Sequence, residues 1–306
     1  QNPFSRSPVS DSVRCGFGGQ GKPQPLTTRS FLHDFTDFKK IGTGCYGEVY
    51  SCTRKLDLCQ YAVKEIKNEM RSERERERVL REIYALATQG DNVHVVRFFS
   101  AWEQDGKLYI QTELCEASLA AIRKERGPQP EPVLREILLQ IAVGLAYMHA
   151  SNVAHLDIKP ENVYATQRGV YKIGDFGLAT VGDSDEHDDE GDKRYLSWEL
   201  LQNDKCDLFK ADVFALGVTV YEMASAEPLP QQGEGYHRLR SGHAPLPGNL
   251  SPELQELLRS LLHPDPAQRP SAAQLVLHPL LHPLLRDESA ACLRASPPAS
   301  ATPCVR

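Results

Sequence analysis

Short apolar runs alternate with turn residues over the first third of the chain. Five segments rich in β-branched and aromatic residues are separated by Gly, Asp and Asn, which is the pattern of short strands joined by turns. These segments are residues 38–41, 48–52, 60–66, 95–102 and 108–112. The pattern predicts a small antiparallel sheet.

One helix interrupts the predicted sheet. Ser72 to Glu75 has the form of a capping box, in which two side chains satisfy free backbone N–H groups at a helix start. Val79, Ile83 and Leu86 follow with a spacing that places them on one helix face. The opposite face carries a run of Glu and Arg, so we expect it to lie in solvent.

From Glu131 onward the apolar residues take helical spacing. The residues with this spacing are Leu134, Leu138, Ile141, Leu145 and Met148, and the segments 211–224 and 254–262. The chain is therefore expected to be an α+β protein, with a small antiparallel β-sheet lobe that carries one helix and a larger, mainly helical lobe.

The two ends differ in composition from this domain. Residues 1–34 and 286–306 hold few large apolar side chains and many small or polar ones, so they cannot bury enough surface to offset the cost of ordering. We predict a disordered lead-in and a flexible tail. The chain begins at Gln1 instead of Met, which indicates a piece of a longer protein.

Charge and cysteine content narrow the class of protein. A formal net charge of -6 gives no support for nucleic-acid binding, because a polyanion requires a basic surface. The eight cysteines include no Cys-x-x-Cys pair, which predicts neither a zinc site nor a disulfide framework and favours a reducing, intracellular compartment. We find no window close to the roughly 18 apolar residues of a membrane span, and no signal peptide.

Candidate chemistry begins with a glycine-rich segment, Gly42 to Val49, between two predicted strands. Glycines let the backbone approach a triphosphate and point N–H groups at it. A dinucleotide-binding fold would place such a segment between a strand and a helix, with an acidic residue about 20 positions later. Because another strand follows here, the pattern indicates a glycine-rich loop that covers the phosphates of a nucleotide.

A lysine and a glutamate are the next candidates for binding the nucleotide phosphates. Lys64 lies on the second strand after the loop, and Glu82 lies 18 residues later, beside the apolar face of the predicted helix. A lysine that grips phosphates must itself be held, which a glutamate does through a charge-assisted pair. Glu77 is the alternative partner, and we favour Glu82.

The segment from His155 to Gly177 supplies the remaining chemistry. Asp157 is placed to accept the proton of a substrate hydroxyl, and Lys159 to neutralise a moving phosphoryl group. Asn162 and Asp175 offer the oxygen ligands that Mg²⁺ shares with phosphates. Any one Asp or Asn is most often a turn residue, but chance does not explain the order and spacing of the whole set.

These motifs resemble those of a eukaryotic protein kinase domain, which would span residues 35–285. The resemblance implies a bilobal fold, with a small lobe at about 35–115 and a large lobe at about 116–285. It also implies that Glu199 pairs with a buried Arg269.

The same resemblance assigns the site residues, with ATP and Mg²⁺ as cofactors. Asp157 and Lys159 would be catalytic, and Asp212 would reach back to their loop. Asn162 and Asp175 would hold the metal. The ATP-binding residues would be Ile41, Gly42, Thr43, Gly44, Cys45, Tyr46, Gly47, Val49, Ala62, Lys64, Glu82, Thr112, Glu113 and Cys115.

Two departures from the usual kinase pattern narrow the family. Leu156 replaces the arginine of His-Arg-Asp, and Asp192 in Glu-Gly-Asp takes the place of a threonine. Four further segments bear on the choice of family, namely residues 94–102, 111–115, 226–230 and 263–266. Together they resemble the Wee/Myt family, which implies a kinase that phosphorylates a tyrosine, an adjacent threonine or both in the glycine loop of a cyclin-dependent kinase in complex with cyclin. Such phosphorylation inhibits the target and delays mitosis. We also expect a monomer in the nucleus or cytoplasm, or on the cytoplasmic face of internal membranes if the chain is Myt-like.

Several alternatives stay open. Residues 108–115 and Gly233 to Gly235 favour Myt and residues 98–102 and 226–230 favour Wee, with a slight lean to Myt. The acceptor, tyrosine or threonine, is also open. A catalytically inactive scaffold would require loss of a phosphate or magnesium group. A serine kinase of translation initiation factor 2α shares residues 95–102, but such enzymes generally keep the loop arginine.

The missing arginine predicts how the enzyme is activated. In many kinases this arginine is repelled by neighbouring positive charge until a phosphorylated activation segment neutralises it. With Leu156 that requirement disappears. We hypothesise that Asp192 pairs with Lys159 and thereby fixes the activation segment in an active arrangement.

Overall fold

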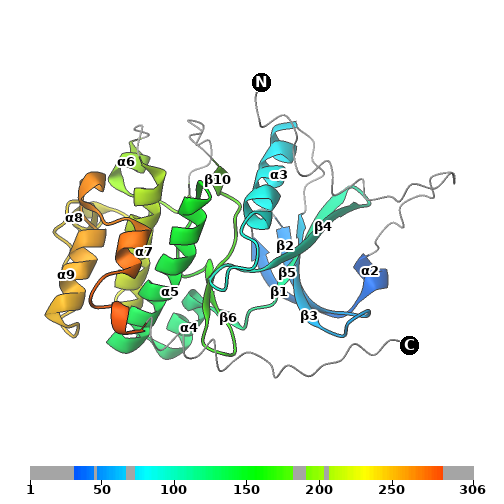
Figure 1. Ribbon diagram of the computed structural model, residues 1–306, viewed down its shortest axis with the longest axis horizontal. Helices are drawn as coiled ribbons and strands as arrows, with labels where there is room; N and C mark the ends of the chain where they lie inside the picture. The colour runs from blue at the N-terminus through cyan, green and yellow to red at the C-terminus, as the bar shows by residue number, and fades with distance from the viewer. Residues whose placement is uncertain (1–30, 45–46, 67–72, 182–190, 203–206, 285–306) are drawn as a thin grey trace.

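The computed structural model of the protein describes residues 31–44, 47–66, 73–181, 191–202 and 207–284. In these ranges an antiparallel sheet with a long helix beside it forms one end of the molecule, and packed helices form the other (Figure 1). The expected α+β, bilobal fold is confirmed.

The small lobe is built on a five-stranded antiparallel sheet with the order β1-β2-β3-β5-β4. Its strands are β1 (Phe35–Gly44), β2 (Gly47–Arg54), β3 (Gln60–Ile66), β4 (Phe98–Gln104) and β5 (Lys107–Glu113). The five predicted strands are confirmed, except that the fourth begins at Phe98 instead of residue 95. Val95 instead forms a parallel bridge with Ile173 of the large lobe, so this segment joins the two lobes.

A short helix, α2 (Phe31–Asp34), precedes the sheet and packs on it. Phe31 is buried, and its ring centroid lies 5.0 Å from that of Tyr109. Trp102 stacks between Phe35 and Tyr109, at centroid distances of 6.0 and 5.3 Å. The predicted lead-in through residue 34 was therefore too long by the four residues of α2, because buried aromatic rings offset the cost of ordering them.

The long helix of the small lobe is α3 (Glu73–Ala87), which corresponds to the one helix that the sequence predicts there. It buries Ala85 and Leu86, and Val79 and Ile83 pack against the same core, as the spacing predicted. Ser72 of the predicted capping box lies outside the described residues. Helix α3 lies beside β4 and β10, which places its inner face at the junction of the lobes.

The large lobe is mainly helical. Its helices are α4 (Leu119–Arg126), α5 (Glu131–Ala150), α6 (Trp198–Leu201), α7 (Leu208–Ala224), α8 (Gly233–Arg240), α9 (Pro252–Leu261), the 3-10 helix Pro266–Gln268 and α10 (Ala272–Val276). Its short strands are β6 (Ala117–Ser118), β7 (Val153–Ala154), β8 (Val163–Ala165), β9 (Tyr171–Ile173) and β10 (Thr180–Val181).

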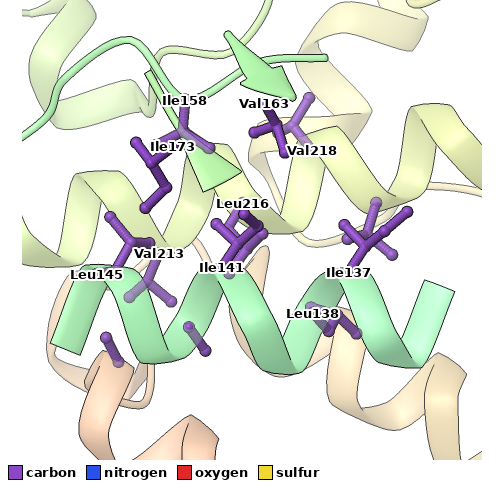
Figure 2. Close-up of a cluster of buried hydrophobic side chains, with 14 of the residues drawn as sticks. Ile137, Leu138, Ile141, Leu145, Ile158, Val163, Ile173, Val213, Leu216 and Val218 are labelled. Atoms are coloured by element: carbon purple, nitrogen blue, oxygen red, sulfur yellow. The ribbon is translucent and has the colours of Figure 1, made fainter. Parts of the chain in front are cut away.

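Helices α5 and α7 form the centre of this lobe. Figure 2 shows Ile141 and Leu145 of α5 pointing toward Val213 and Leu216 of α7, and all four side chains are fully buried. Gly144 of α5 permits a close approach, since a Cβ there would lie 2.9 Å from the backbone oxygen of His94. The segments that carry the candidate site thus rest directly on the core.

Helix α5 is long and apolar enough, by length and composition, to cross a membrane. The expectation that the chain holds no such window is therefore wrong for residues 131–150. In the structure Leu138, Ile141 and Leu145 have no exposed surface, and α5 packs against α7, α10 and β9. We therefore interpret α5 as the core helix of the lobe.

The expected pair of Glu199 and Arg269 is confirmed. Arg269 is 2% exposed and binds both carboxylate oxygens of Glu199, at 2.5 and 3.1 Å. Its guanidinium also donates to the carbonyls of His263 and Pro264. The pair ties α6 to the end of the large lobe.

Replacing one member of this pair leaves a buried charge unpaired. Glu199→Gln should lower the free energy of unfolding by about 3–5 kcal/mol. Urea denaturation would measure the change, and Glu234→Gln, at an exposed position of α8, is the matched control. A Glu199→Gln protein as stable as the control would show that the pair contributes little.

Candidate active site

A cleft lies between the sheet of the small lobe and the loops of the large lobe, with an empty volume of about 770 Å³ that includes its open mouth. Of the predicted ATP-binding residues, the cleft is lined by Ile41, Val49, Ala62, Lys64, Glu82, Thr112, Glu113 and Cys115. Asp175, a predicted metal ligand, lines it too. A largely apolar lining with a few convergent polar groups is typical of a small-molecule site.

The described part of the predicted glycine-rich segment forms the end of β1 and the start of β2. Gly42 pairs with Val49 and Thr43 with Glu48, but neither Gly42 nor Thr43 lines the cleft itself. Gly47 also lies outside the lining, and a Cβ there would lie 2.1 Å from the backbone oxygen of Glu65, so only glycine fits. Gly44 ends β1, while Cys45 and Tyr46 lie outside the described residues.

Several residues that line the cleft are not predicted from the sequence. They are Leu86, Val96, Ile110, Leu114, Tyr164, Gly174 and Phe176. Most are apolar residues, and their pattern cannot be told from that of ordinary core residues. Two of them could have been predicted from their sequence neighbours, since Leu114 lies between two predicted site residues and Tyr164 follows Asn162 by two positions.

Lys64 and Glu82 form the expected ion pair. The Lys64 Nζ lies 2.6 Å from Glu82 Oε1 and 3.3 Å from Asp175 Oδ1. Burial by itself opposes a charged amine, but these two carboxylates outweigh it and raise the pKa of Lys64. The alternative partner, Glu77, is exposed on α3. Lys64 therefore stays charged, held between a helix of the small lobe and a loop of the large lobe.

Asp175 stands at the open end of this pair. Burial would raise its pKa, but the Lys64 ammonium lowers it, so the group is a carboxylate. Its backbone has a positive φ of 57°, a conformation that Asp tolerates better than most residues. The next residue, Phe176, is buried with its ring 5.1 Å from that of His155. This packing keeps the carboxylate at the cleft while the phenyl ring points into the core.

The catalytic candidates share one hydrogen-bonded cluster. Lys159 Nζ lies 2.9 and 2.8 Å from the two carboxylate oxygens of Asp157. The Asn162 side-chain nitrogen donates to the backbone oxygen of Asp157 and, at 2.7 Å, to its carboxylate. The structure thus brings the three predicted residues together and fixes the carboxylate from two sides.

Asp212 of α7 holds the backbone of this loop, as expected. One carboxylate oxygen accepts the N–H of His155 and the other that of Leu156, both at 2.8 Å. His149 of α5 lies 2.9 Å from the first of these oxygens. Asp212 has no exposed surface, so the loop is anchored to the buried face of α7.

The residues also fit a magnesium ion. Among the described residues, no group of three His, Cys, Asp or Glu side chains is placed to hold a metal. The candidate pair is instead one carboxylate, Asp175, and one amide, Asn162. Since the Asn162 nitrogen is used by Asp157, its amide oxygen is left as the ligand atom. One carboxylate and one amide oxygen suit a Mg²⁺ ion that takes its other ligands from phosphates and water.

The hypothesis that Asp192 pairs with Lys159 is wrong. Asp192 binds Arg194 instead, through side-chain contacts of 2.5 to 3.1 Å and through the Arg194 backbone N–H at 3.0 Å. Burial raises the pKa of Asp192, but the bonds from Arg194 outweigh this and lower it. The planar guanidinium two residues away closes a local turn, whereas Lys159 is already bound by Asp157.

Leu156 contacts the same segment through apolar groups. It lines a small cavity with Tyr195, Leu196 and Asp192, and its φ is 62°. A Cβ at Gly191 would lie 3.3 Å from the Leu156 backbone oxygen, so the glycine of Glu-Gly-Asp permits a close approach. Where many kinases have an arginine that meets a phosphate, this chain packs a leucine.

Trp198 marks the other end of this segment. It occupies the place of proline in the usual Ala-Pro-Glu element and is 38% exposed. Its ring lies 5.8 Å from that of His237 on α8. The segment therefore meets α8 through an aromatic contact.

Comparison with known proteins agrees with this geometry. The family model described as protein kinase domain matches residues 35–281. Wee1-like protein kinase 2 of Danio rerio is 42% identical over 275 residues, which cover 81% of this chain and 52% of that protein. The protein of the same name from Gallus gallus is 39% identical over 91% of this chain and 53% of its own length. Wee1-like protein kinase 1-B of Xenopus laevis is 39% identical over 82% and 46%, respectively.

The chain spans about half the length of the curated relatives it matches. The family match covers both lobes that border the cleft, and the relatives cited above are all named Wee1-like protein kinases. This chain therefore belongs to the protein kinase family and is a Wee-type kinase.

Proposed function

We propose that this protein kinase transfers the γ-phosphoryl group of ATP to the glycine-loop tyrosine, the adjacent threonine, or both, of a cyclin-dependent kinase in complex with cyclin. The transfer would inhibit the target and delay mitosis. The names of the relatives support the Wee side over the Myt side, toward which the sequence segments leaned. This favours tyrosine as the main acceptor.

The intact set of polar contacts in the cleft carries this proposal. Lys64, fixed by Glu82, would bind the phosphates of ATP. Asn162 and Asp175 would hold Mg²⁺, which neutralises charge on the phosphates. Asp157 would accept the proton of the acceptor hydroxyl. Lys159, whose Nζ lies 2.8 Å from the Asp157 carboxylate, would offset charge on the phosphoryl group.

The contacts of the activation segment support the inference that this kinase needs no activating phosphate. Asp192 and Arg194 satisfy each other within the segment, and Leu156 presents no cation that would require a phosphate. Treatment with a protein phosphatase should therefore leave the activity unchanged.

Transfer to a cyclin-dependent kinase complex tests the proposal directly. The protein is incubated with MgATP and the complex, and the phosphorylated residue is mapped by mass spectrometry. Phosphate on the glycine-loop tyrosine or adjacent threonine is expected. Transfer to serine alone would favour a kinase of the initiation-factor type, and no transfer would favour a scaffold.

Removing the candidate base should abolish most of this transfer. Asp157→Asn should lower kcat by about 10²–10⁴-fold with little change in ATP affinity, because the lost group accepts a proton and does not hold the nucleotide. Asp105→Asn, at an exposed turn between β4 and β5, is the control. Equal kcat values for the two variants would exclude Asp157 as the base.

The pair within the activation segment has its own test. Asp192→Thr should lower kcat/KM for the protein acceptor about ten- to a hundredfold, because losing a hydrogen-bonded ion pair costs roughly 1.5–3 kcal/mol. Arg194→Gln should have a similar effect, and the double variant should be no worse than either single one. Undiminished activity of Asp192→Thr, or additive losses, would contradict a coupled pair.

A further inference from the structure

Arg240, the last residue of α8, is a buried cation. It is 3% exposed, and burial lowers its pKa to about 10. Within the described residues its four hydrogen bonds all go to backbone carbonyls and none to a carboxylate. A buried guanidinium without an opposite charge is costly, so the dipoles that solvate it must be held in place around it.

Three of these carbonyls belong to the end of the activation segment. Arg240 Nη2 donates to the oxygens of Lys193 at 2.6 Å and Arg194 at 3.0 Å, and Nε donates to that of Leu196 at 2.9 Å. The fourth belongs to Tyr236 in the same helix. The Tyr236 hydroxyl also donates to the Lys193 oxygen at 3.0 Å, and its ring centroid lies 3.6 Å from the guanidinium carbon. One side of α8 thus grips residues 193–196.

The opposite side of this segment faces the catalytic loop. Arg194 Nη2 lies 3.7 Å from Glu161 Oε1, four residues beyond Asp157. The Tyr195 hydroxyl donates to the buried Glu222 of α7. Residues 193–196, which we call the platform, therefore lie between the catalytic loop and α8.

We propose that Arg240 is a positioning residue for the protein acceptor: by binding the carbonyls of 193, 194 and 196 from below, it sets the height of this platform relative to Asp157. Helix α8 supplies from inside the fold the fixation that an activating phosphate supplies in other kinases. The inference rests on the proposed transfer to a protein hydroxyl, and it holds for any acceptor.

Kinetics separate this role from a purely structural one. Arg240→Lys keeps the charge but not the three-way donor geometry, and Arg240→Met removes both. Each should raise KM for the acceptor about tenfold or more, while KM for ATP and ATP hydrolysis without acceptor stay within about twofold. The control is Arg238→Met, an exposed arginine of α8 that donates only to the His243 carbonyl among the described residues.

The acceptors are the cyclin-dependent kinase complex and, in parallel, a glutamate–tyrosine copolymer. A wild-type protein that phosphorylates only the copolymer would refute the proposed substrate and still test the platform. Equal loss of ATP hydrolysis and acceptor transfer in both Arg240 variants would overturn the inference, because it would indicate general disruption. An unchanged acceptor KM would overturn it as well.

Limited proteolysis tests the contacts of Arg240 without a measurement of enzyme activity. Trypsin attacks the carbonyl of the lysine or arginine after which it cuts, and the carbonyls of Lys193 and Arg194 are bound by Arg240. Cleavage after these residues, identified by mass spectrometry, should be at least several-fold faster in Arg240→Lys than in wild type or Arg238→Met. Unchanged cleavage at these two bonds would count against the platform.

A milder variant covers the case in which the Arg240 proteins do not fold. Tyr236→Phe removes only the hydroxyl that supports the Lys193 carbonyl. It should raise KM for the acceptor about two- to threefold at an unchanged melting temperature, in line with one lost hydrogen bond. No change in KM would contradict the proposal.

Discussion

The geometry of the active site depends on one buried carboxylate. Asp212 belongs to the core helix α7, yet both of its oxygens accept backbone N–H groups of the catalytic loop. Because α7 is packed against α5, the position of Asp157 is tied to the buried core of the large lobe. A fully buried carboxylate would be unfavourable without these partners, so loop and core hold each other.

The cleft is then closed by charged contacts that cross between the lobes. Lys64 joins Glu82 of α3 to Asp175 of the large lobe. Behind the cleft, Lys172 of β9 lies 2.7 Å from Glu113 at the end of β5. These charged contacts lie beside an apolar core that is continuous between the lobes, since Ile66, Leu86 and Ile110 of the small lobe belong to the same buried cluster as the residues of α5 and α7.

Residue pattern and charge type were enough to predict most of this arrangement. The strands follow from alternation, and Glu82 was preferred over Glu77 because it lies beside the apolar face of its helix. The partner of Asp192 could not be predicted, since a turn two residues long decides between Arg194 and Lys159. The role of Arg240 was hidden too, because a basic residue in the last turn of a helix usually interacts with solvent and the helix dipole. Helix α2 was missed because its four residues owe their order to aromatic rings up to about 80 positions away.

The placement of the aromatic residues has a practical consequence. The chain contains two tryptophans, and the structure puts one in each lobe. Trp102 is stacked in the aromatic cluster beneath α2, whereas Trp198 borders the acceptor platform beside His237. Intrinsic fluorescence can therefore report on the two lobes separately, with either tryptophan replaced by phenylalanine. Docking of a protein on the platform would change one emission and leave the other as a built-in reference.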